Sequence, residues 1–164
     1  MYICTQNNYI MVNTYSQIHI QAVFAVQNRL SLINNEWKDR LYHYMTAIIQ
    51  NKGHKMLAIG GMPDHVHLFF GFRPDDPLSL LIQELKRCST LWINNNHLVR
   101  GRFSWQKGYG AFSYSKSQIP IICNYIARQE EHHRKKSFVS EYIETLERFG
   151  VEYDKRYIFK DVMG

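Results

Sequence analysis

Two histidines placed two residues apart are the first feature of this sequence that could carry out chemistry. His65 and His67 lie in the segment 62–70, whose other residues are largely apolar and typical of a buried strand. Successive side chains of a strand point to opposite faces, so both imidazoles share one face with Cβ atoms roughly 7 Å apart. Such a pair is able to bind one divalent cation if a third ligand comes from elsewhere. An ordinary strand that binds nothing would look the same.

A tyrosine and a glutamine form the second candidate group. Tyr125 and Gln129 are four residues apart in a segment whose isoleucines recur with helical spacing. Residues four apart lie one turn above each other on a helix, so we expect the phenol and the carboxamide to reach the same point. His132 and His133 extend that face. An exposed tyrosine on an ordinary helix is the simpler interpretation of this pair.

The third feature is a basic, aromatic segment interrupted by glycines, residues 100–110. Its charges would attract phosphate groups, and its rings would stack on unpaired bases. A surface loop whose aromatic rings anchor it to the core would have the same composition. Together with two basic residues of the preceding helix, the candidate DNA contacts are Lys86, Arg87, Arg100, Arg102, Trp105, Lys107 and Tyr109.

Composition indicates one globular domain with a polyanionic partner. The chain has 164 residues, of which 45% are hydrophobic and 23 are aromatic, so it is able to form one sizeable core. Its formal net charge of +6 favours a partner such as nucleic acid.

The cysteines and the hydropathy indicate a cytoplasmic protein. Cys4, Cys88 and Cys123 are odd in number and widely spaced, which predicts neither a disulfide framework nor a thiolate zinc site. No apolar run is long enough to span a membrane, and the polar opening residues are unlike a signal peptide. We therefore expect no membrane partner.

Hydrophobic periodicity predicts the elements that position these groups. The expected order is a strand over 17–26, a helix over 35–52, strands over 55–62 and 65–72, a helix opening at Asp76-Pro77, a strand over 111–114, a helix capped by Ser117, and a helix over about 138–149.

The order strand, helix, strand, strand, helix, strand predicts an α+β fold. It closes most simply as a ferredoxin-like (RRM-like) antiparallel sheet with two helices on one face. The histidine pair then lies on the other face, and we expect the helix that carries Tyr125 to cover it. Residues 1–15 are expected to be an N-terminal extension, and residues 16–164 a single domain.

Three motifs together resemble a known family. They are Pro63-Asp64-His65-Val66-His67, Trp105-Gln106-x-Gly108-Tyr109-Gly110-x-Phe112-Ser113 and Tyr125-Ile126-x-x-Gln129-x-x-His132-His133. Their order and spacing resemble the single-tyrosine HUH transposases of the smallest bacterial insertion sequences, and are also similar to REP-associated tyrosine transposases. Arg128 stands where an asparagine is expected and Tyr114 where a small aliphatic residue is expected, which leaves the target sequence open.

The resemblance implies a mechanism and an assembly. Tyr125 would be the nucleophile, and His65, His67 and Gln129 would hold Mg²⁺ or Mn²⁺; two imidazoles and an amide oxygen suit Mn²⁺ somewhat better. The enzyme would nick and rejoin single-stranded DNA at hairpin-bearing element ends through a 5′-phosphotyrosine. It would be a homodimer with residues 115–117 as the hinge. Such a hinge would let the Tyr125 helix dock on the histidines of the other chain, which is the arrangement we expect, or cover its own sheet.

Two other functions agree with the same residues. One is a host-adapted single-strand endonuclease that acts on repeated palindromes, and the other is a non-catalytic nucleic-acid-binding module that has the same sheet.

Overall fold

A four-stranded antiparallel sheet lies at the centre of the protein. The computed structural model describes residues 15–158, except for the side chains of His132 and His133. The sheet order is β2-β3-β1-β4, and each neighbouring pair is antiparallel. The strands are β1 (His19–Ala25), β2 (Lys55–Met62), β3 (His65–Gly71) and β4 (Gly110–Tyr114). The expected α+β class and its antiparallel sheet are confirmed.

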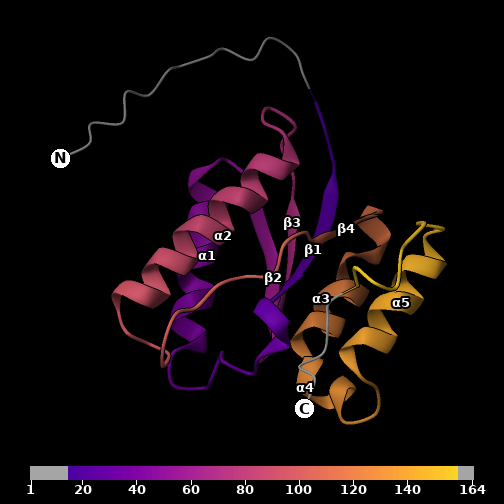
Figure 1. Ribbon diagram of the computed structural model, residues 1–164. Helices are drawn as coiled ribbons and strands as arrows, with labels where there is room; N and C mark the ends of the chain where they lie inside the picture. Colours follow the sequence, from indigo (N-terminus) through magenta and orange to yellow (C-terminus); the bar gives the residue numbers. More distant parts are fainter. Residues whose placement is uncertain (1–14, 159–164) are drawn as a thin grey trace.

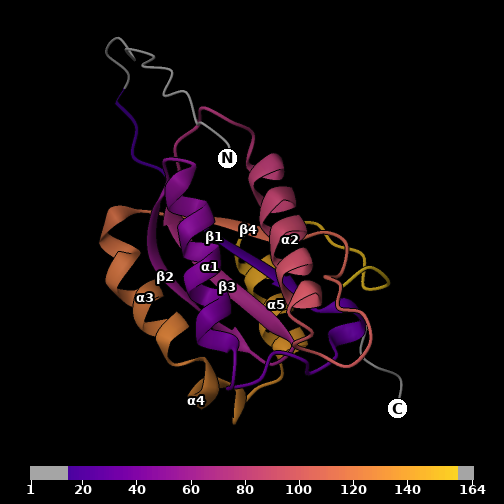
Figure 2. The same ribbon diagram turned by 90° about the vertical axis from the view of Figure 1, so that its left-hand side faces the viewer.

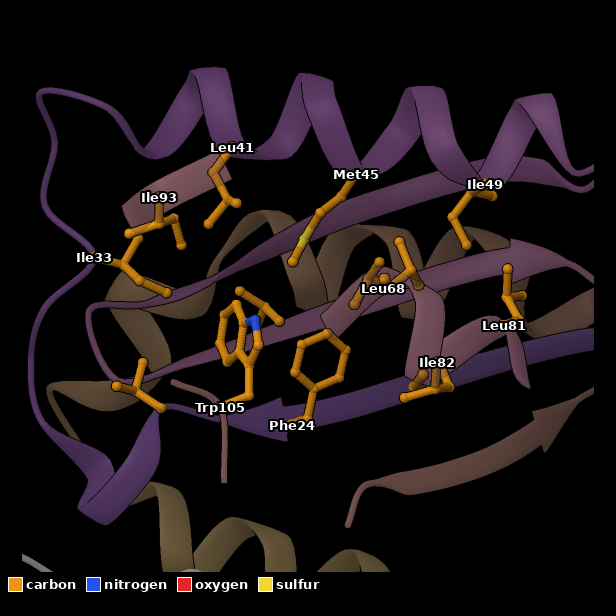
Figure 3. Close-up of a cluster of buried hydrophobic side chains, with 14 of the residues drawn as sticks. Phe24, Ile33, Leu41, Met45, Ile49, Leu68, Leu81, Ile82, Ile93 and Trp105 are labelled. Atoms are coloured by element: carbon orange, nitrogen blue, oxygen red, sulfur yellow. The ribbon is translucent and has the colours of Figure 1, made fainter. Parts of the chain in front are cut away.

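Helices α1 (Lys38–Asn51) and α2 (Leu78–Asn95) cover one face of the sheet (Figures 1 and 2). Alternation along the strands sends Phe24 and Leu68 into this layer, where they are fully buried. Figure 3 shows these side chains beside Met45 of α1 and Trp105. This layer is the main hydrophobic core.

Helices α3 (Ile119–Ala127), α4 (Gln129–His133) and α5 (Phe138–Arg148) lie on the opposite face, so the molecule has three layers (Figure 1). Val23 and Phe112 of the sheet pack with Phe138 of α5, whereas Phe69 packs with Ile126 of α3. Strand β3 is consequently buried on both faces from His65 to Phe70. The face that carries the histidines is covered by the C-terminal helices of the same chain.

The segment that carries Tyr125 and Gln129 is two helices rather than one. Arg128 leaves the helical conformation, with φ −104° and ψ 24°, and its backbone N–H donates to the carbonyl of Asn124 at 3.1 Å and of Tyr125 at 3.3 Å. Helix α4 then begins at Gln129. The expectation that the phenol and the carboxamide lie on successive turns of one helix was therefore wrong.

The last helix agrees with its prediction. The Ser137 hydroxyl accepts a hydrogen bond from the backbone N–H of Ser140 at 3.3 Å, which caps α5. Gly150 follows the helix with a positive φ of 63°, the left-handed conformation that ends many helices.

Segment 100–110 is anchored in the core by its aromatic residues. Trp105 pairs with Val26 in an isolated bridge and packs edge-on against Phe24 with ring centroids 4.8 Å apart. Its indole N–H donates to the Ser89 hydroxyl at 2.8 Å. Trp105 is thus a buried core residue, and its ring is not available to stack on a DNA base.

Lys86, which we expected to be an exposed DNA contact, also binds within the protein. Its ammonium donates to the carbonyl oxygen of Gln106 at 2.9 Å and to that of Gly108. Burial lowers the pKa of Lys86 to about 8. The residue holds the 100–110 segment against α2.

Within residues 15–158, no helix is both long and apolar enough to cross a membrane. The predicted extension over residues 1–15 falls outside the described part of the chain except for Tyr15.

Candidate active site

The histidine pair lies at the start of β3, a central strand of the sheet, beneath the C-terminal helices. The rings of His65 and His67 have centroids 5.1 Å apart and are steeply inclined, at 78°. His67 pairs with Val23 on β1 and with Gly60 on β2. His65 is 0% exposed and His67 4%, which excludes the interpretation of two solvated surface histidines.

An acidic residue orients the first ring. Nδ1 of His65 lies 2.7 Å from a carboxylate oxygen of Asp64, and the guanidinium of Arg29 donates to the other oxygen at 3.3 Å. Burial raises the pKa of Asp64, but the hydrogen bond from His65 and the nearby charge of Arg29 outweigh it, so that the pKa lies below its ordinary value. The carboxylate therefore holds a proton on Nδ1 and leaves the Nε2 lone pair for a ligand.

An amide orients the second ring. The Gln21 amide nitrogen lies 3.0 Å from Nδ1 of His67, and the Gln21 oxygen accepts a hydrogen bond from the Tyr114 hydroxyl at 3.2 Å. Burial raises the pKa of Tyr114, although the Arg148 charge opposes this, so the hydroxyl stays protonated. The Tyr114 hydroxyl is able either to donate or to accept a hydrogen bond. The Gln21 amide is therefore able to turn over, so that its nitrogen donates to Tyr114 and its oxygen accepts from Nδ1–H of His67.

The C-terminal helices bring Tyr125 and Gln129 to this pair within one chain. The half-buried Tyr125 ring lies edge-on to His67, with centroids 5.8 Å apart and planes at 89°. Oε1 of Gln129 lies 3.5 Å from Nε2 of His65, and Gln129 is 1% exposed. This cis arrangement differs from our expectation that the tyrosine helix docks on another chain.

A glycine allows the close approach of α3 to the sheet. A Cβ atom at Gly60 would lie 2.7 Å from the carbonyl oxygen of Ile126 and 3.0 Å from its Cγ2. Ile126 directly follows Tyr125, so any side chain at position 60 would displace the turn that carries the phenol.

Phe138 covers the pair from α5, a role that sequence reasoning missed. Its ring stacks on that of His65, with centroids 3.8 Å apart and planes at 16°. The sequence shows that Phe138 is the first residue of a capped amphipathic helix, but only the tertiary structure shows which residues that helix covers.

The donor set fits a divalent cation. Two cis ligands of an octahedral Mg²⁺ or Mn²⁺ are separated by about 3 Å when each metal–ligand bond is about 2.1 Å. The 3.5 Å between Nε2 of His65 and Oε1 of Gln129 is close to that value. Residues 15–158 contain no cluster of three His, Cys, Asp or Glu side chains suited to a metal ion.

The remaining candidate DNA contacts do not join this site. Arg100, Arg102 and Lys107 are exposed, and Arg87 forms an ion pair with Glu84 of its own helix at 2.9 Å. Tyr109 packs against the main core, on the side of α1 and α2.

Comparison with known proteins defines the class. The profile of the family described as "Transposase IS200 like" matches residues 14–129, so the chain belongs to that family of transposases. A search of curated proteins found no match.

Solved structures show the same fold. One is a protein of Deinococcus radiodurans R1 described as a candidate transposase, with a TM-score of 0.59 and 24% identity over 72% of this chain and 95% of that chain. Another is a REP-associated tyrosine transposase bound to a REP hairpin, with a TM-score of 0.55 and 17% identity over 74% of this chain and 72% of that chain.

Proposed function

We propose that this transposase nicks and rejoins single-stranded DNA through a covalent bond to Tyr125, with a divalent metal held by His65, His67 and Gln129. One observation carries the proposal: a single chain places the Tyr125 ring 5.8 Å from that of His67, beside a second histidine and a buried amide. Few structural roles require a phenol, two imidazoles and a carboxamide to converge in one buried place.

The reaction is a transesterification that needs no external energy source. The Tyr125 oxygen forms a bond to phosphorus while the bond from phosphorus to the 3′ oxygen breaks. The phenol loses its proton, and the departing 3′ oxygen gains one. The product is a 5′-phosphotyrosine, and the reverse attack by a 3′ hydroxyl of another strand completes transfer.

The residues around the phenol prepare this step. A free phenol has a pKa of about 10 and is a weak nucleophile at neutral pH. A bound Mg²⁺ or Mn²⁺ would stabilise the phenolate and polarise a phosphoryl oxygen. Asp64 fixes the imidazole of His65, and Gln21 would fix that of His67 once its amide has turned over to accept from Nδ1–H.

The substrate is single-stranded DNA with hairpins. The net charge of +6 favours a polyanion, and one solved structure with this fold is described as bound to a REP hairpin. Exposed Arg100, Arg102 and Lys107 are the candidate phosphate contacts, so binding should weaken as salt rises. Transposition and host-adapted cleavage of repeated palindromes share this chemistry, and we favour transposition because the family is one of transposases.

Substitution of the nucleophile tests the proposal. Tyr125→Phe should abolish the covalent adduct on single strands that carry the DNA flanking the gene, while hairpin binding stays within about twofold, because only one oxygen is removed. A 3′-end label remains with the protein and reports the adduct on a denaturing gel.

Two controls make the result decisive. Tyr157→Phe alters a tyrosine that is 79% exposed and distant from the site in sequence, and it should cleave as the wild type does. Excess chelator should stop the wild-type reaction. An adduct that persists in Tyr125→Phe would remove this residue from the mechanism, and the absence of any wild-type adduct would favour a binding module.

A further inference from the structure

A cavity of about 260 Å³ lies directly beside the candidate nucleophile. The sheet forms one wall, with Gln21, His67, Phe112 and Tyr114, and α3 contributes Tyr125. Helix α5 closes the other side with Phe138 and Tyr142 among others. The proposed reaction uses only the edge of this space, at His67 and Tyr125.

The charges around the cavity balance. Lys136 forms an ion pair with Glu144, and Arg148 and Glu141 are the other charged groups of the lining. Burial, and then the Glu144 charge, raises the pKa of Glu141 to about 7. With two acids, one of them partly neutral at pH 7, and two bases, the lining carries little net charge and selects only weakly for a phosphate, whereas its mixture of rings and polar groups suits a neutral, flat, hydrogen-bonding molecule.

The size agrees with one such molecule. The volume of about 260 Å³ corresponds to about nine water molecules at roughly 30 Å³ each, which is room enough for a flat ring system such as a nucleobase. The ring pair Phe112–Tyr142, with centroids 6.3 Å apart and planes at 72°, provides both a face and an edge for contact with a base.

Tyr125 stands between this cavity and a more open hollow. The second space, about 390 Å³, is lined by Asn124, Tyr125, Arg128 and Lys135 among others. A DNA strand with its phosphate at the phenol would therefore have one flanking nucleotide near the first cavity and the other near the more open hollow, where Arg128 and Lys135 outnumber Glu131.

We propose that the cavity between the sheet and α5 binds the base of a nucleotide next to the scissile phosphate and so selects the sequence at the cleaved bond. This inference rests on the proposed function, because it takes single-stranded DNA as the substrate. Stacking in the pocket would both hold the base and fix the strand against Tyr125.

A variant that fills the cavity tests the inference by binding alone. Thr145 lines the cavity from α5, and Thr145→Phe would occupy the space without altering Tyr125 or the candidate metal ligands. Ser140→Phe places the same ring on an exposed position of α5 and is the matched control. The probes are fluorescent dA10, dC10, dT10 and a ten-residue abasic strand, bound in excess chelator so that no strand is cut.

The wild type and Ser140→Phe should bind the preferred base at least about fivefold more tightly than the abasic strand, because stacking of one base contributes about 1–3 kcal/mol. Thr145→Phe should lose most of that ratio and keep its affinity for the abasic strand. Thr145→Leu, which is less bulky, should lose part of that ratio. It keeps the test valid if the phenylalanine prevents folding.

The base pocket would be refuted if the wild type and both Thr145 variants showed the same ratio of affinities for the preferred base and the abasic strand. It would also be refuted if the wild type bound the strands with and without bases equally tightly. The covalent adduct at Tyr125 is measured separately with the flanking DNA. If the wild type forms no adduct but still prefers the strand with bases over the abasic strand, the proposed function alone is refuted. If it forms the adduct but does not prefer the strand with bases, the pocket alone is refuted.

Discussion

At the scale of single residues, the partner of each imidazole decides which nitrogen is offered to a cation. Asp64 holds Nδ1 of His65 at 2.7 Å, which leaves Nε2 towards Gln129. Gln21 performs the equivalent function for His67 only when its oxygen accepts from Nδ1–H, with the amide nitrogen donating to Tyr114.

Removal of the Gln21 amide should therefore weaken metal binding without removing a ligand. Gln21→Leu is expected to reduce the affinity for Mn²⁺ by about 10–100-fold, which is the usual cost of losing a hydrogen bond to a ligating histidine. Calorimetric titration with Mn²⁺ measures it. Gln17→Leu, the same change at an exposed position before β1, should have no effect; unaltered affinity in Gln21→Leu would show that the amide does not orient His67.

The sequence carried the residue types of this site but not their partners. The spacing of His65 and His67 indicated a possible ion site, and the roles of Tyr125 and Gln129 came from the resemblance to a known family. The Gln21–His67 and Gln21–Tyr114 contacts join residues from different strands, and no local spacing records them. Trp105 was predicted as a DNA contact for a related reason. The sequence of a basic loop with an aromatic residue is the same whether that ring faces DNA or the core.

At the scale of elements, the distance between α3 and the sheet positions the phenol, and Gly60 sets that distance. The nearest atom to a Cβ at Gly60 would be the backbone oxygen of Ile126, which cannot rotate away as a side chain would. Ile126 belongs to the last turn of α3, beside Tyr125.

Gly60→Ala should consequently move the nucleophile while leaving the fold intact. We expect a loss of about 1–3 kcal/mol of stability from overpacking, and a fall of about 100-fold in the rate of adduct formation if α3 shifts by about 1 Å. Gly71→Ala is the control, because the nearest atom to its Cβ is 3.7 Å away. Thermal unfolding and adduct kinetics measure both effects, and a Gly60→Ala protein as fast as Gly71→Ala would refute the role of this contact.

Periodicity predicted the elements well because most of them bury one regular face. It failed at Arg128, where hydrophobic spacing continues although the backbone turns. The turn redirects Gln129 towards His65, and this benefit comes from tertiary contacts that a helical pattern does not contain.

At the scale of the whole molecule, the connection between β4 and α3 decides whether one chain or two form the site. We expected residues 115–117 to be a loose hinge. In the structure Lys116–Gln118 is a short 3₁₀ helix, and the backbone N–H of Ser115 donates to the Gln118 side chain at 2.9 Å in a capping box. This ordered connection leads α3 onto its own sheet.

A complete site in one chain makes a clear prediction for mixtures of inactive proteins. Tyr125→Phe keeps the histidines and lacks the nucleophile, whereas His67→Ala keeps the nucleophile and lacks a ligand. A site shared between chains would recover one working copy in a mixed dimer, but a cis site leaves both copies broken. We expect no adduct from the mixture, measured after the proteins are unfolded and refolded together so that any subunits exchange.

Wild-type protein taken through the same procedure must regain activity, and tags of different size on the two variants show whether mixed dimers form. Cleavage by the mixture would mean that α3 exchanges between chains during the reaction, in spite of the capped connection and the close packing at Gly60.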